Sequence, residues 1–145
     1  MHNLIKLFEG ALSAGCKRFV FASSTAVYGN VKAPFKESGS VMPLNPYAES
    51  KLALEEKAME FASKNSGVTV VGLRYCNVYG PGEFYKGKAA TMIYQCAQQM
   101  LHGNPRLFKW GEHKRDYIYV KDVVEANILG AKSKQSCIVN CGSGS

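Results

Sequence analysis

A tyrosine and a lysine four residues apart, Tyr47 and Lys51, could form an acid/base pair within the segment NPYAESK (45–51). A free phenol titrates near pH ~10, so it acts as a base at neutral pH only when a neighbouring cation stabilises the phenolate. The spacing alone is not diagnostic, because it occurs twice more, at Tyr28–Lys32 and Tyr117–Lys121. The surrounding element must therefore decide which pair can carry out proton transfer.

Only the Tyr47–Lys51 pair falls on a predicted helix. Asn45 can cap a helix that begins with Pro46, where the missing N–H costs nothing, and the helix is predicted to run to about Lys64. Positions i and i+4 of a helix share a face, with Cβ atoms about 5–6 Å apart. The other two pairs straddle the Gly29–Asn30 turn or follow a strand, where four residues span about 13 Å. A packed phenol beside a solvated amine is still the more common result of this local pattern.

Helix and strand patterns alternate along the whole chain. Helices are predicted at about 4–14, 46–64, 89–102 and 122–132, and strands at 18–24, 68–75, 106–110, 115–120 and 137–140. Segment 27–46 is predicted to be a loop because it is polar and rich in glycine and proline, and segment 76–87 is predicted to be a loop that leads to the third helix. Strand 68–75 has β-branched residues on both faces, which is typical of a strand buried on both sides. This alternation predicts an α/β fold with a mainly parallel sheet, in one domain over residues 1–145.

Composition narrows the class of protein. A hydrophobic content of 46% with 20% charged residues is typical of a globular domain, and no apolar run is long enough to span a membrane. The net charge of +7 favours anionic partners, but nucleic acid ranks low without an arginine-rich run or zinc-finger spacing. The five cysteines include no C-x-x-C pair, which favours buried, unpaired thiols in a reducing cytoplasm and indicates no metal site.

Four motifs occur in a specific order: FASSTAVYG (21–29), NPYAESK (45–51), LRYCNVYGPG (73–82) and RDYIYVKDVVEA (115–126). Together they resemble the extended short-chain dehydrogenase/reductase family, which comprises the sugar-nucleotide epimerases and dehydratases. The resemblance covers essentially the whole chain. It implies a partial Rossmann-like, doubly wound sheet, NADP or NAD as the cofactor, a nucleotide-sugar substrate and a homo-oligomeric full-length form.

The resemblance also implies a catalytic group made of Ser24, Tyr47 and Lys51. Ser24 ends a predicted strand, where open α/β sheets place their ligand crevices, and its hydroxyl could contact both the substrate and the Tyr47 phenol. Thr25 is the second choice for this role. Lys51 carries several donors, so it could also bind the nicotinamide ribose.

A closer similarity joins GPGEFYKGKAATM (80–92) and RLFKWGEHKRDYIYVKDV (106–123) to the branch of the family that epimerises ADP-glycero-manno-heptose for lipopolysaccharide biosynthesis. It implies that Lys86 is a second catalytic group that also contacts the cofactor, and that Val78 is a further cofactor contact. The implied substrate-binding residues are Ser24, Asn77, Lys88, Gln95, Phe108 and Arg115. An arginine suits this role because it can bind a diphosphate bidentately.

Three positions depart from that branch: Gly82 replaces a common arginine, Cys76 a phenylalanine and Lys88 a smaller residue. Two other activities therefore stay open, UDP-hexose 4-epimerisation and nucleotide-sugar 4,6-dehydration, and Lys86 would be dispensable in a 4-epimerase. A third hypothesis is that the protein is not an enzyme but a non-catalytic remnant or interaction module that keeps the core of the fold.

The glycine-rich dinucleotide fingerprint is not found in these 145 residues. In the family it precedes a segment like residues 1–24, so the chain is expected to correspond to the central portion of a longer member. The isolated chain is then expected to bind dinucleotide weakly, because the pyrophosphate lacks its helix N-terminus. It is also expected to expose an apolar sheet edge. Tight NADP binding by calorimetry would contradict the first expectation.

Overall fold

A computed structural model of the chain describes residues 2–107, 111–112 and 114–144. The elements follow one another as α1 (His2–Ser13), β1 (Arg18–Ser24), the short 3₁₀ helix η1 (Thr25–Tyr28), α2 (Pro46–Lys64), β2 (Thr69–Tyr75), β3 (Asn77–Tyr79), the 3₁₀ segment η2 (Glu83–Ala89), α3 (Met92–Met100), β4 (Tyr117–Tyr119), α4 (Val120–Lys132) and β5 (Cys137–Cys141). The predicted α/β class is therefore confirmed.

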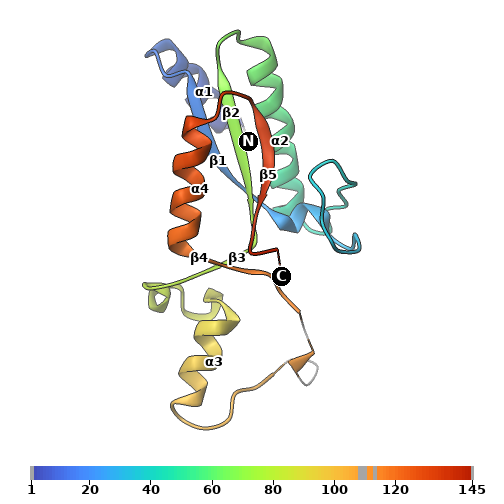
Figure 1. The fold of residues 1–145 in the computed structure, drawn as a ribbon, viewed down its shortest axis with the longest axis vertical. Helices are drawn as coiled ribbons and strands as arrows, with labels where there is room; N and C mark the ends of the chain where they lie inside the picture. Colours follow the sequence, from blue (N-terminus) through green and yellow to red (C-terminus); the bar gives the residue numbers. More distant parts are fainter. Residues whose placement is uncertain (1, 108–110, 113, 145) are drawn as a thin grey trace.

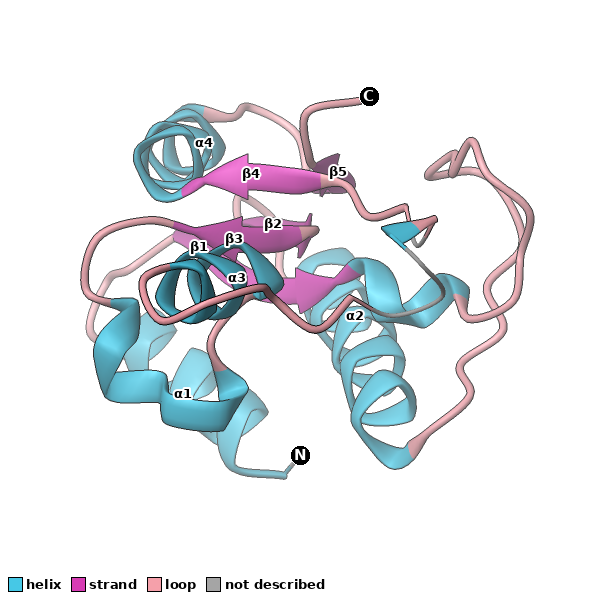
Figure 2. Cartoon of the chain, turned by 90° about the horizontal axis from the view of Figure 1, so that it is seen from below, coloured by secondary structure: helices cyan, strands magenta, loops and turns pink. Residues whose placement is uncertain are grey.

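The strands form two parallel sheets. β2 lies between β1 and β5, and the shorter β3 pairs with β4. In Figure 2 the three-stranded sheet lies between α4 on one face and α1 with α2 on the other, which makes three layers. Figure 1 shows β3 and β4 crossing below that sheet, with α3 farther down in the same view. Among the described residues no strand pairs with the outer edge of β1.

The central strand β2 contributes to two hydrophobic clusters because its side chains alternate between faces. Val70 packs on the α1–α2 side, together with Phe8, Phe19, Phe21, Ala58 and Phe61. Val71 and Leu73 pack on the α4 side, together with Ile118, Val123 and Cys141. The prediction that this strand is buried on both faces is therefore confirmed.

Helix α2 begins as its cap residues predict. The Asn45 side chain accepts a hydrogen bond from the Ala48 amide at 2.9 Å, Pro46 is the first helical residue, and the helix ends at Lys64. At its middle, Glu55 is buried and pairs with Arg74 of β2, Nη2 to Oε2 at 2.7 Å. This ion pair fixes the helix to the sheet.

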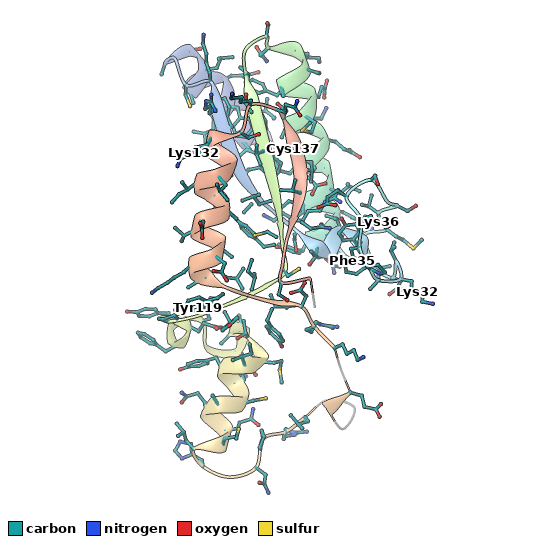
Figure 3. The ribbon with its side chains drawn as sticks, viewed as in Figure 1. Lys32, Phe35, Lys36, Tyr119, Lys132 and Cys137 are labelled. Atoms are coloured by element: carbon teal, nitrogen blue, oxygen red, sulfur yellow. The ribbon has the colours of Figure 1, made fainter. Side chains whose placement is uncertain are left out.

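The Arg74 guanidinium extends that contact into a buried network. Its Nη1 donates to the Tyr28 hydroxyl at 2.8 Å, and the same hydroxyl donates to Asn140 at 2.8 Å. Phe35, on the loop to the side of the sheet in Figure 3, stacks on the Tyr28 ring with centroids 4.5 Å apart. The connection between η1 and α2 is therefore fastened to both β2 and β5.

The part of the chain after β2 differs from the prediction. Segment 76–87 is not a plain loop, because it contains β3 and the start of η2. The third helix begins at Met92 rather than near 89, since Thr91 caps it by accepting from the Tyr94 amide at 3.4 Å. No strand includes Arg106 or Leu107, and residues 108–110 of the predicted strand lie outside the described residues. Strand 115–120 shortens to β4, because α4 already begins at Val120.

No helix in the described part of the chain is both long and apolar enough to cross a membrane.

Candidate active site

A cavity of about 650 Å³ opens where the parallel strands end. Its volume lies within the ~300–1,000 Å³ of small-molecule pockets. β1 ends at Ser24 and β2 at Tyr75, and both line the cavity, as expected for ligand crevices at the carboxyl edge of an open sheet. Further lining residues come from α2, β3, η2, α3, β4 and the segment before β4, and they include Tyr47, Lys51, Asn77, Val78, Lys86 and Arg115.

Tyr47 and Lys51 lie on the first turns of α2 and both line this cavity. The Tyr47 side chain is 55% exposed. The Lys51 Nζ lies 5.7 Å from the centre of the Tyr47 ring and donates to the Ala22 carbonyl of β1 at 2.9 Å. The ammonium is therefore anchored on the strand, close to the ring of the phenol.

The other two Tyr–Lys pairs do not combine an exposed phenol with a shared helix face. Tyr28 is completely buried, and its hydroxyl is shared between Arg74 and Asn140. Tyr117 begins β4, whereas Lys121 lies in the first turn of α4. The local structure thus distinguishes the Tyr47–Lys51 pair from the other two pairs, as expected from its position on a predicted helix.

Ser24 is held at the edge of the cavity by its own capping role. It precedes η1 with extended backbone angles, and its Oγ accepts from the Ala26 amide at 3.1 Å. Because the oxygen accepts in this bond, the hydroxyl can still donate. Thr25 instead donates to the Tyr75 carbonyl at 3.2 Å and is not among the residues that line the cavity.

Lys86 reaches the cavity from η2, an element separate from α2. Its side chain is half-exposed, and its Nζ lies 3.9 Å from Glu83 Oε2. Glu83 itself is buried. Burial, the largest influence, raises the pKa of the Glu83 carboxyl, but hydrogen bonds from Thr91 and Gly80 outweigh it and hold the pKa below its ordinary value. An ionised carboxylate thus lies beside the Lys86 ammonium.

Asn77 and Arg115 both line the cavity, and Asp116 contacts the first and follows the second in sequence. The Asp116 carbonyl accepts from the Asn77 backbone amide at 3.1 Å and from its Nδ2 at 2.9 Å. The Asp116 carboxylate accepts from Ser143 and Gly144, and these bonds outweigh the upward effect of burial, so its pKa is lowered. Asp116 thereby joins the C-terminal segment to the cavity wall.

The remaining predicted residues are placed elsewhere. Lys88 and Gln95 do not line the cavity, and Gln95 Nε2 donates to the Lys88 and Ala90 carbonyls at 3.1 and 2.7 Å. Phe108 lies outside the described residues. Their roles in substrate binding stay predictions.

Three further residues line the cavity without a role predicted from the sequence: Tyr75, Cys76 and Cys96. Burial raises the pKa of the Tyr75 phenol, and its hydroxyl is hydrogen-bonded to Asn127. Burial and the nearby Asp116 charge raise the pKa of the Cys76 thiol to about 11. Both groups are therefore protonated at neutral pH. The position of Tyr75 at the end of a predicted strand was the signal that could have placed it here.

No group of three or more His, Cys, Asp or Glu side chains that could hold a metal ion occurs in the described ranges 2–107, 111–112 and 114–144.

Known proteins share this fold. The sequence profile of the NAD dependent epimerase/dehydratase family matches residues 2–142. The chain therefore belongs to that family.

Several solved structures are similar over nearly the whole chain. A UDP-N-acetylglucosamine 4-epimerase from Methanobrevibacter ruminantium is 37% identical with a TM-score of 0.88, over 97% of this chain and 46% of that one. The ADP-L-glycero-D-manno-heptose-6-epimerase of Helicobacter pylori is 41% identical with a TM-score of 0.87, over 96% and 44%. The UDP-glucose 4-epimerase of Thermus thermophilus, solved with NAD, is 35% identical with a TM-score of 0.80, over 97% and 47%. The chain thus spans less than half the length of each.

Proposed function

We propose that the full-length protein is a nucleotide-sugar epimerase that uses NADP or NAD, with an ADP-heptose as its substrate and Tyr47 and Lys86 as its two acid/base groups. The observation that carries this proposal is that the two side chains come from different elements, α2 and η2, and line one cavity. The heptose-6-epimerase of Helicobacter pylori, at 41% identity, supports the choice of substrate. Cytoplasmic location and homo-oligomerisation belong to the same proposal.

The chain's own residues fit a nicotinamide nucleotide at this site. Lys51 has three donors, of which one is given to Ala22, so it can also donate to ribose hydroxyls. Val78 offers an apolar contact on the β3 side of the same cavity. When bound, the nicotinamide supplies reversible hydride transfer, and the Thermus thermophilus relative was solved with NAD.

The proton chemistry would fall to Tyr47, Ser24 and Lys86. Tyr47 accepts the proton of the sugar hydroxyl, with the Lys51 ammonium favouring the phenolate. Ser24 donates a hydrogen bond to the same oxygen. In the two-base form of the reaction the sugar oxygen is reprotonated on the side opposite the one where it lost its proton, and Lys86 would serve the side opposite Tyr47. Asn77 and Arg115 hold the rest of the substrate, where the Arg115 guanidinium suits its diphosphate.

Two substitutions test this assignment in the full-length protein. Tyr47→Phe and Lys86→Met should each lower kcat by about 10²–10⁴-fold, the usual contribution of a general acid or base. Calorimetry should show the substrate affinity of both variants to be nearly unchanged. Lys64→Met, at an exposed position on the far end of α2, is the control and should keep full turnover.

A second candidate, UDP-hexose 4-epimerisation, is favoured by the similarity to the UDP-N-acetylglucosamine 4-epimerase. That reaction would need Tyr47 but not Lys86. Normal turnover of Lys86→Met, together with activity on a UDP-hexose, would replace the first candidate with the second. If Tyr47→Phe also turned over normally, the catalytic assignment would be wrong altogether.

A further inference from the structure

The segment that carries Lys86 is closed into a ring by the buried side chain of Glu83. Glu83 Oε1 accepts from the Gly80 amide at 3.2 Å and from the Thr91 hydroxyl at 3.0 Å. Oε2 accepts from the Thr91 amide at 2.7 Å. One carboxylate therefore joins the end of β3 to the start of α3, and Lys86 lies on the chain between these two points.

A carboxylate in this position is unusual, because its side chain is only 5% exposed. Burying a charge is costly unless it is hydrogen-bonded and paired. Both oxygens of Glu83 are satisfied by the donors of Gly80 and Thr91, and the Lys86 ammonium lies 3.9 Å from Oε2. Lys86 is thus the charge partner of a group that is itself immobilised.

The backbone of this segment is irregular, so the hydrogen bonds of Glu83 are needed to hold it in place. η2 is not a continuous helix, since Gly87 breaks it with φ 51° and ψ −123°, and Gly82 precedes it with φ 90°. Gln95 of α3 holds the far end through its bonds to the Lys88 and Ala90 carbonyls. Lys86 therefore lies between two fastened points, next to the break in η2 at Gly87.

We propose that Glu83 is a positioning residue that sets the place of the Lys86 ammonium in the cavity. It does so in two ways, by closing the 80–91 ring and by pairing with Nζ. This inference rests on the proposed function, because positioning matters to turnover only if Lys86 transfers a proton. The competing explanation is that Glu83 merely stabilises the fold and has no separate effect on Lys86.

A double-mutant cycle in the full-length protein separates these explanations. Glu83→Gln keeps the size of the side chain and removes its charge, and it should lower kcat by about 10²-fold, the cost of a misplaced reacting group. KM should change much less. The double variant Glu83→Gln/Lys86→Met should turn over no more slowly than Lys86→Met alone, because both changes remove one function. Additive losses would overturn the proposal.

The matched control is Glu60→Gln. Glu60 also pairs with lysines, Lys57 at 3.0 Å and Lys64 at 2.6 Å, but on the exposed face of α2. Its replacement should leave kcat unchanged. A loss of turnover in this variant would mean that the effect of Glu83→Gln is a general consequence of removing a carboxylate.

A second readout does not depend on activity. Reductive ¹³C-methylation of the lysines gives one NMR signal for each amine, and Lys86→Arg identifies that of Lys86. Glu83→Gln should shift the Lys86 signal and speed hydrogen exchange at the Thr91 amide, whereas Glu60→Gln should move only the signals of Lys57 and Lys64. An unchanged Lys86 signal in Glu83→Gln would overturn the positioning role even if Lys86→Met is inactive. A shifted Lys86 signal in Glu83→Gln, together with normal turnover of Lys86→Met, would overturn the proposed function instead.

Discussion

The chain buries two glutamates, Glu55 and Glu83, in different surroundings. Glu55 lies between α2 and β2, where Arg74 donates to both of its oxygens, at 2.9 and 2.7 Å, and Ser23 adds a short hydrogen bond. Glu83 lies beside the cavity, and its close partners are Gly80 and Thr91. The first carboxylate is thus paired with a buried cation, and the second with backbone donors and a half-exposed amine.

This difference separates support of the fold from support of the site. The Glu55–Arg74 pair joins two layers of the α/β/α arrangement, and the hydrogen bonds that Arg74 donates to Glu55 keep the pKa of Arg74 above its ordinary value. The Glu83 bonds shape one irregular segment next to a candidate catalytic lysine. Loss of the first should therefore appear mainly in stability, and loss of the second mainly in turnover.

The largest effect is expected from Arg74→Ala. It leaves the Glu55 carboxylate buried without its cation, which typically costs about 3–5 kcal/mol of the free energy of unfolding. Urea denaturation would measure the loss. Lys64→Ala is the control, because it removes an exposed ion pair and should leave the urea midpoint unchanged. A loss below about 1 kcal/mol in Arg74→Ala would show that the buried pair does not secure the layers.

A smaller loss is expected when both partners are replaced together. Glu55→Met/Arg74→Leu removes both buried charges and fills their space with apolar atoms, so the protein should lose less than about 2 kcal/mol. The same urea titration measures it. If the double variant were as unstable as Arg74→Ala, the unpaired Glu55 charge would not be the cause of the instability of Arg74→Ala. The lost contacts of Ser23 and Tyr28 would then be the cause.

The smallest effect is expected in the pH dependence of the contribution that Glu83 makes to the free energy of unfolding. Because the folded-state pKa lies below the ordinary value of 4.5, the folded protein favours the carboxylate. Its stabilisation is present above that value and is lost as pH falls through the folded pKa. The stability difference between the wild-type protein and Glu83→Gln should stay constant from pH 7 to about 5.5 and shrink below pH 4.5. Urea titrations across this range measure it, and a difference that grew toward acid would contradict the assignment.

The first half of the chain could be predicted well because its signals are local. Asn45 and Pro46 define the start of α2, and β-branched residues on both faces of segment 68–75 indicated a strand buried on both sides, as found. The contrast among the three Tyr–Lys pairs also followed from local structure. The placement of Ser24, Tyr47 and Lys51 around one cavity agrees with those predictions, and their catalytic roles stay predictions.

The second half depends on distant contacts that no local pattern reveals. β3 exists because Asn77–Tyr79 pairs with Tyr117–Tyr119, far away in the sequence. η2 is held by Glu83, which lies in segment 76–87, where the sequence predicts only a loop. Gln95 resembled a substrate contact in sequence, yet its amide is bonded to neighbouring carbonyls. Contacts of this kind can be identified only in the folded structure, where the segments lie next to one another.

The most direct test is a crystal structure of the full-length protein with its dinucleotide and a slowly reacting nucleotide sugar. We expect the sugar ring to lie between the Tyr47 hydroxyl and the Lys86 ammonium, each within hydrogen-bond distance of an oxygen on the reacting carbon or its neighbour. A sugar bound on one side of the cavity, with Lys86 directed into solvent and Glu83 turned away from it, would contradict it.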